Sequence, residues 1–99
     1  MEEWSAKEFE HAKQGVVAVF FYTPICGTCK LGERMLQVVK ELLPTISFKK
    51  VNLNYSPELS TKLEIQSVPC LTILRNGEVV KQIFAFQSVE YLYHELSSI

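Results

Sequence analysis

Residues 16–30 read VVAVFFYTPICGTCK, an apolar run followed closely by two cysteines. The segment Val16–Tyr22 is continuous, β-branched and aromatic, which is typical of a strand covered on both faces, and Thr23-Pro24 ends it. Beyond Cys29, apolar residues recur at helical spacing as far as Leu42. The two cysteines are therefore predicted to lie where a buried strand passes into a helix.

This junction suits thiol chemistry, because only the thiolate attacks a disulfide and a free thiol with a pKa of about 8.5 is mostly protonated at neutral pH. The first turn of a helix offers unpaired N–H groups and the positive end of the helix dipole, both of which favour an anion. We expect Cys26 to be the exposed nucleophile. Cys29, one turn further and more buried, is expected to resolve the resulting mixed disulfide.

Other interpretations of the pair are a chance spacing, a pair of core residues, or half of a metal site. A zinc or iron–sulfur site needs about four ligands, and the remaining candidates, Cys70, His11 and His94, are scattered along the chain. Metal binding is therefore disfavoured and no cofactor is expected. A secreted domain held together by disulfides normally has an even number of four or more cysteines, and this chain has three.

Length and composition limit the number of domains and the kinds of partner that can be expected. The 99 residues are 47% hydrophobic with a net charge of −1, as expected for a single domain over residues 1–99. The chain has no basic block, so nucleic acid is not an expected partner. The longest apolar run is too short to cross a bilayer, and the acidic N-terminus does not resemble a secretory signal. We expect a cytoplasmic monomer that does not bind membranes.

The rest of the chain alternates helical and strand patterns without a repeat or a linker. Asn76-Gly77 between two apolar runs is a strong hairpin signal. The expected elements are helices over 5–14, from about Cys26 to 42, 57–64 and 89–99, and strands over 16–22, 46–53, 70–74 and 79–84. This order predicts an α/β fold, a three-layer α/β/α sandwich around a mixed sheet.

The chain resembles the thioredoxin family over nearly its whole length. The matching segments are Tyr22–Lys30 with its CGTC motif, KVNLN at 50–54, IQSVP at 65–69 and RNGE at 75–78. The resemblance implies a thioredoxin-like fold and protein thiol–disulfide oxidoreductase activity. It also implies disulfide-containing protein substrates, and reduction by a flavoprotein such as a thioredoxin reductase or by a low-molecular-weight thiol.

The resemblance further implies a substrate-binding surface around the cysteines. Pro69 corresponds to the family's cis-proline, and the backbone of Val68 corresponds to the segment that pairs with bound peptide in strand fashion. Gly27 lets a partner's backbone approach closely. Ile25 and Thr28 complete the expected surface, where they replace a tryptophan and a proline of familiar thioredoxins.

The chain also departs from the family pattern. It contains no aspartate, and Phe20 occupies the position of the buried aspartate that assists the resolving thiol. Glu33 or Lys50 could substitute through water, although an exposed helix charge and an ordinary edge-strand lysine are the simpler interpretations. The N-terminal strand of full-length thioredoxins is reduced to residues 1–4, so a four-stranded sheet is expected.

Two further interpretations stay open at this stage. Cys70 follows Pro69 and is either a third redox thiol near the site or a small apolar residue under a helix, and strand alternation favours the latter. The whole protein could instead be a binding adaptor with weak redox activity, as the bulky Phe84 and the missing aspartate suggest. An oxidant or isomerase is a third and weaker possibility.

Overall fold

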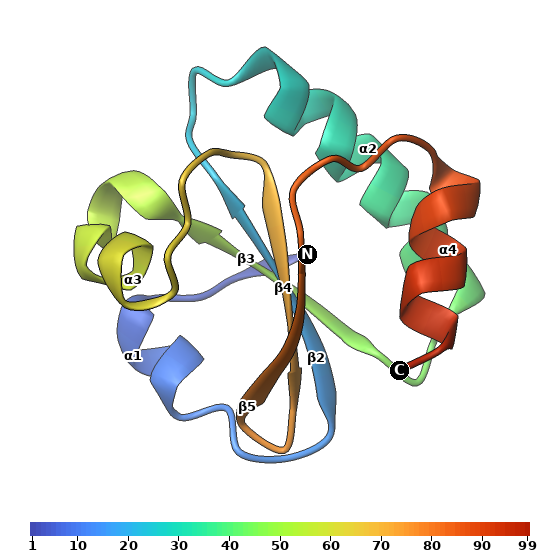
Figure 1. Cartoon of the computed structure of the whole chain (residues 1–99), viewed down its shortest axis with the longest axis horizontal. Coiled ribbons are helices and arrows are strands. Elements are labelled where there is room, and N and C mark those ends of the chain that lie inside the picture. Colours follow the sequence, from blue (N-terminus) through green and yellow to red (C-terminus); the bar gives the residue numbers. More distant parts are fainter.

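The computed structural model describes residues 1–99 as five strands, four α-helices and one short 3₁₀ helix (Figure 1). In chain order these are β1 (Glu2–Glu3), α1 (Ala6–Glu10), β2 (Val16–Tyr22), α2 (Gly27–Leu42), β3 (Ser47–Asn52), η1 (Leu53–Tyr55), α3 (Pro57–Lys62), β4 (Cys70–Arg75), β5 (Glu78–Ile83) and α4 (Val89–Ser97). None of the helices is long and apolar enough to cross a membrane.

The strands form one mixed sheet in the order β1-β3-β2-β4-β5. Strands β1, β3 and β2 are parallel, whereas β4 and β5 run antiparallel to their neighbours. Helices α2 and α4 cover one face of this sheet, and α1 and α3 cover the other (Figure 1). The predicted three-layer α/β/α sandwich with a mixed sheet is confirmed.

The expected number of strands was wrong, because the sheet has five strands and not four. The additional strand, β1, contains two residues and pairs in parallel with Lys49 and Lys50 of β3. Two residues are too few to show a strand period, so only contacts with distant residues define β1. The backbone N–H of Trp4 donates to the carbonyl of Lys50 at 2.7 Å and extends this pairing. Strand β3 is consequently not an edge strand.

The central strand β2 places side chains in two separate hydrophobic clusters. Ala18 and Phe20 belong to cluster 1, between the sheet and helices α2 and α4. Val17, Val19 and Phe21 belong to cluster 2, between the sheet and helices α1 and α3. Because both faces of β2 are buried, its sequence is apolar throughout and does not alternate.

Local signals placed most of the elements within a few residues. Ser5 and Glu8 form a capping box at the start of α1, although the helix ends at Glu10 and not near the expected residue 14. The Ser56 side chain makes no capping hydrogen bond to α3. Asn76 and Gly77 have φ of 51° and 87°, as the predicted tight β4–β5 hairpin requires.

Candidate active site

The two cysteines lie at the N-terminus of α2. The chain leaves β2 at Tyr22, and four residues later Cys26 caps the helix in an extended conformation, with φ −107° and ψ 108°. The Cys26 Sγ accepts a hydrogen bond from the backbone N–H of Cys29 at 3.1 Å. The pair forms a disulfide with its Cα atoms 5.1 Å apart. An unpaired helix N–H is thus directed at the first sulfur, as the sequence predicts.

The environments of the two sulfurs differ. Cys29 is only 3% exposed and belongs to cluster 1, whereas Cys26 is half-buried at its margin. The residues around Cys26 are open to solvent, since Gly27 and Thr28 are exposed and Ile25 is 95% exposed. The Thr28 Oγ1 lies 3.4 Å from the Cys26 Sγ, a contact that sequence reasoning missed. A partner molecule can therefore reach Cys26 but not Cys29.

The Val68–Pro69 peptide bond is cis, in agreement with the family resemblance. A groove of about 450 Å³ brings Pro69 together with Thr28. Its other lining residues, mostly apolar, are Leu31, Gly32, Met35, Phe84, Ala85, Phe86 and Gln87. Of the five predicted substrate-binding residues, the groove thus includes Thr28 and Pro69 but not Ile25, Gly27 or Val68. Val68 instead packs, like Cys26, at the margin of cluster 1.

Phe20 fills the position at which the family resemblance implies a buried aspartate. Its side chain is fully buried, with its ring centroid 5.7 Å from that of Tyr22 and 6.0 Å from that of Phe86. In the parallel register of β2 and β3, Lys50 lies beside Phe20. The space below the cysteines is therefore apolar, with one cationic side chain at its border.

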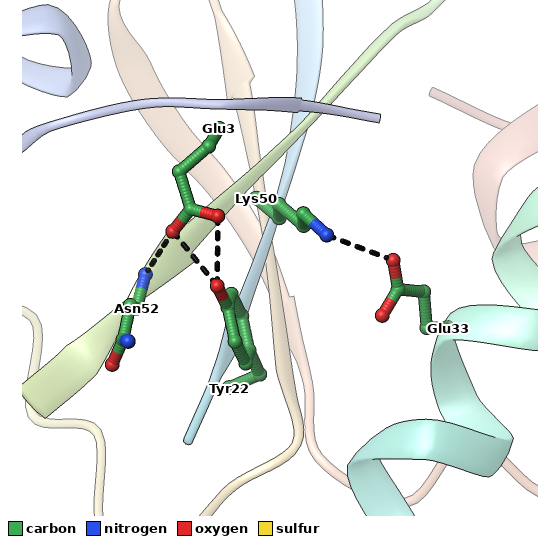
Figure 2. A network of polar contacts seen from close by, with 5 residues as sticks. All are labelled: Glu3, Tyr22, Glu33, Lys50 and Asn52. Carbon is green, nitrogen blue, oxygen red and sulfur yellow. Dashed lines mark hydrogen bonds and ion pairs between the residues drawn. The ribbon is translucent and has the colours of Figure 1, made fainter. Parts of the chain in front are cut away.

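Glu33 and Lys50 form an ion pair, with Lys50 Nζ 3.1 Å from Glu33 Oε2 (Figure 2). Both side chains are about one quarter exposed, at 25% for Lys50 and 27% for Glu33. Glu33 is therefore not a fully solvated helix charge, and Lys50 does not lie on an edge strand. Sequence spacing alone does not reveal this pair, because it joins α2 to β3 across the layers of the fold.

A network around Glu3 adjoins this ion pair (Figure 2). The Tyr22 hydroxyl donates to both carboxylate oxygens of Glu3 at 2.8 Å, and the backbone N–H of Asn52 donates to the same carboxylate at 3.2 Å. Lys50 Nζ lies 5.6 Å from the centre of the Tyr22 ring. Burial, the hydrogen bond to Glu3 and the nearby negative charges raise the pKa of Tyr22 above its ordinary range. Tyr22 therefore stays a neutral donor.

Cys70 belongs to a different part of the molecule. It is fully buried in cluster 2, on the face of the sheet opposite to Cys29. This placement confirms the interpretation of Cys70 as a small core residue. His11, His94 and Cys70 do not gather around the CGTC motif, and the structure contains no cluster of three or more potential metal ligands.

Comparison with known proteins places these features in a family. The thioredoxin family model matches residues 2–98. The chain belongs to the thioredoxin family. A thioredoxin-like protein of Bacillus subtilis, YusE, is 44% identical over 93 residues, which cover 94% of this chain and 88% of that protein. The B. subtilis thioredoxin is 31% identical over 80 residues, which cover 80% of this chain and 77% of that protein.

Solved thioredoxins share this fold. A variant of the Halobacterium salinarum thioredoxin superposes with a TM-score of 0.85 at 22% identity, covering 98% of this chain and 89% of that one. Oxidised mitochondrial thioredoxin 3 of Saccharomyces cerevisiae superposes with a TM-score of 0.81 at 19% identity, covering 98% of this chain and 92% of that one. The thioredoxin fold is therefore confirmed. Family membership together with the CGTC disulfide makes the protein a thiol–disulfide oxidoreductase.

Proposed function

We propose that this thioredoxin-family protein is a reductase of protein disulfides in which Cys26 attacks and Cys29 resolves. The observation that carries the proposal is the hydrogen bond from the N–H of Cys29 to the Cys26 Sγ at the start of α2. The same N–H can stabilise negative charge on the sulfur in the reduced protein. Because Cys26 is also the more exposed residue of the pair, the nucleophile that this N–H activates is the one that a substrate can reach.

The reaction proceeds through two exchanges. The Cys26 thiolate attacks one sulfur of the substrate disulfide, whose S–S bond breaks as a Cys26–substrate bond forms. The Cys29 sulfur, after losing its proton, attacks the Cys26 sulfur and displaces the second substrate thiolate. The substrate gains two electrons and two protons, and the protein keeps the Cys26–Cys29 disulfide. The second exchange is intramolecular, which favours it over attack on the mixed disulfide by an external thiol.

A reductant returns the protein to the dithiol. Family membership implies reductant partners in general. We assign this role to a flavoprotein of the thioredoxin-reductase kind or to a low-molecular-weight thiol, which makes the protein a carrier in an electron-transport chain. Such a donor attacks the more exposed sulfur, that of Cys26, so both half-reactions use the same surface.

The proposed substrate surface comprises Ile25, Gly27, Thr28, Val68 and Pro69. The exposed Ile25 side chain offers an apolar contact beside the nucleophile. Gly27 has no neighbouring atom within 4 Å of where a Cβ would lie, so a substrate backbone can approach closely there. Thr28 and Pro69 border the apolar groove, which suits the side chains that flank a substrate cysteine.

We place this activity in the cytoplasm, in a monomer folded as one domain over residues 1–99. Two hydrophobic clusters on opposite faces of one sheet support a single domain, as does the family match over residues 2–98. The single buried cysteine outside the pair fits a reducing compartment, where structural disulfides are rare.

Serine variants of the two cysteines test the proposal. We expect Cys26→Ser to abolish the protein's acceleration of insulin disulfide reduction by dithiothreitol, because no accessible nucleophile remains. Cys29→Ser is expected to accumulate mixed disulfides, visible as mass adducts, because Cys26 still attacks. Serine is also a favourable helix cap, so α2 keeps its N-terminus in Cys26→Ser.

The alternative function, a binding adaptor with weak redox activity, has a specific basis in Phe84, which is 38% exposed and lines the groove. An adaptor would show negligible turnover in the wild-type protein. It would also keep its partners when both cysteines are replaced by serine. That combination of results would overturn the proposed reductase.

A further inference from the structure

Cys29 has to lose a proton before it attacks, yet its own surroundings are apolar. It is 3% exposed and shares cluster 1 with Phe20, Leu36 and Phe86, none of which accepts a proton. Burial in such surroundings disfavours the thiolate. A nearby proton acceptor would therefore accelerate the second exchange of the proposed reductase.

Helix geometry places one carboxylate on the turn that follows Cys29. Glu33 is four residues further along α2, and residues at this spacing lie on the same face with Cβ atoms about 5–6 Å apart. Helical side chains lean toward the N-terminus, so the Glu33 side chain leans toward the turn that carries Cys29. Side chains at this spacing can come close enough for a single water molecule to bridge their polar ends.

The ion pair with Lys50 holds the Glu33 carboxylate on the sheet side of α2 (Figure 2). Lys50 lies beside Phe20 in the β2–β3 register, and Phe20 shares the cluster of Cys29. The Lys50 ammonium is itself held over the Tyr22 ring, whose hydroxyl is anchored by Glu3. The carboxylate is thus held between α2 and β3 and does not extend freely into solvent.

The other charged or titratable groups near Cys29 are poor proton acceptors. They are Lys30 on α2, Tyr22 on β2, Lys50 on β3 and Tyr91 on α4. A lysine ammonium has no acceptor site, and a tyrosine hydroxyl is a far weaker base than a carboxylate. Glu3 is bound by Tyr22 and Asn52 on the far side of β3. Glu33 is the carboxylate that remains.

We propose that Glu33, oriented by Lys50, accepts the proton of Cys29 through a bridging water during resolution. This inference rests on the proposed function. As the Cys29 S–H bond breaks, the proton passes through water to the Glu33 carboxylate, and the Cys29 sulfur attacks the Cys26 sulfur. The Cys26–substrate bond breaks, the Cys26–Cys29 bond forms and the substrate leaves as a thiolate. Glu33 then returns the proton to solvent or to that thiolate.

A single-turnover reaction with an aromatic disulfide tests this role, because each released thiol absorbs visible light. One equivalent is released when Cys26 attacks and a second when Cys29 resolves. We expect Glu33→Gln to slow the second release at pH 7 by about 10- to 100-fold, at the lower end of general-base effects because water mediates the transfer. The first release should change less than about twofold.

The pH profile separates proton acceptance from simple electrostatics. Removing a negative charge near Cys29 favours its thiolate and on that basis alone would accelerate resolution. We expect instead a Glu33→Gln rate that starts low and rises about tenfold per pH unit, approaching the wild-type rate between about pH 8 and pH 9 as the thiol ionises unaided. Glu33→Asp keeps a carboxylate and should fall between the wild-type and glutamine rates.

The ion pair of Lys81 and Glu95 offers a matched control. It is 2.9 Å long and similarly exposed, at 31% and 33%, but joins β5 to α4. Glu95→Gln should leave both releases within about twofold of wild type. An unchanged or faster second release in Glu33→Gln would overturn the inference and leave the proposed function intact. No second release from the wild-type protein would overturn the proposed function itself.

Discussion

Cys70 provides a test of the fold through the pH dependence of stability. Its thiol is fully buried in cluster 2, and this burial raises its pKa from an ordinary value of 9.0 to about 11, against a smaller opposing effect of the Thr72 hydroxyl 3.6 Å away. A two-unit shift corresponds to about 2.7 kcal/mol. We therefore predict that replacing Cys70 by alanine changes the dependence of folding stability on pH in the alkaline range.

The direction of this pH dependence of folding stability follows from proton linkage. The folded-state pKa is raised, so the contribution of Cys70 to stability is fully present below pH 9 and is lost as the pH rises toward 11. In that window the unfolded chain releases the thiol proton while the folded protein keeps it. With these two pKa values the loss reaches about 1.4 kcal/mol at pH 10.

The assay is urea unfolding of the protein with Cys26 and Cys29 replaced by serine, with and without Cys70→Ala, from pH 8 to pH 10. The serine background prevents disulfide exchange, and the titration of lysines and tyrosines cancels between the two proteins. We expect the stability difference between them to shrink by about 1.3 kcal/mol over this range. A difference independent of pH would refute the assignment of Cys70 as a buried thiol.

Two further predictions concern packing beside the active site. Gly32→Ala places a Cβ 3.0 Å from two ring atoms of Phe86, and an overpacking cost of about 1–3 kcal/mol exceeds the helix-propensity gain of about 1 kcal/mol. Urea unfolding should show a loss of about 1 kcal/mol, whereas Gly27→Ala, with open space around it, should show none. Tyr22→Phe keeps the ring but removes the hydrogen bond to Glu3, and should cost about 1 kcal/mol in the same assay. Unchanged stability of Gly32→Ala, or a loss above about 3 kcal/mol for Tyr22→Phe, would contradict these assignments.

Local sequence pattern was sufficient for much of the fold. The uninterrupted apolar run of β2 indicates burial on both faces, because nothing in it alternates, and the structure places β2 at the centre of the sheet. The hairpin at Asn76-Gly77 and the capping of α2 by Cys26 likewise depend on residues next to one another in the chain. Backbone conformational preferences act over a few residues, so they can be read from a short stretch.

Other features depend on which strands become neighbours, and short stretches of sequence do not contain that information. Strand β1 exists because two residues meet β3, some 47 positions along the chain. The Glu33–Lys50 pair requires α2 to lie over β3 with Lys50 on the facing side, and a shift of one residue in register would turn Lys50 to the opposite face. The groove beside the cysteines likewise forms only when Pro69, Phe86 and α2 come together. Long-range packing therefore determines the surroundings of the two cysteines, whereas their thiol–disulfide chemistry could be predicted from their spacing in the sequence.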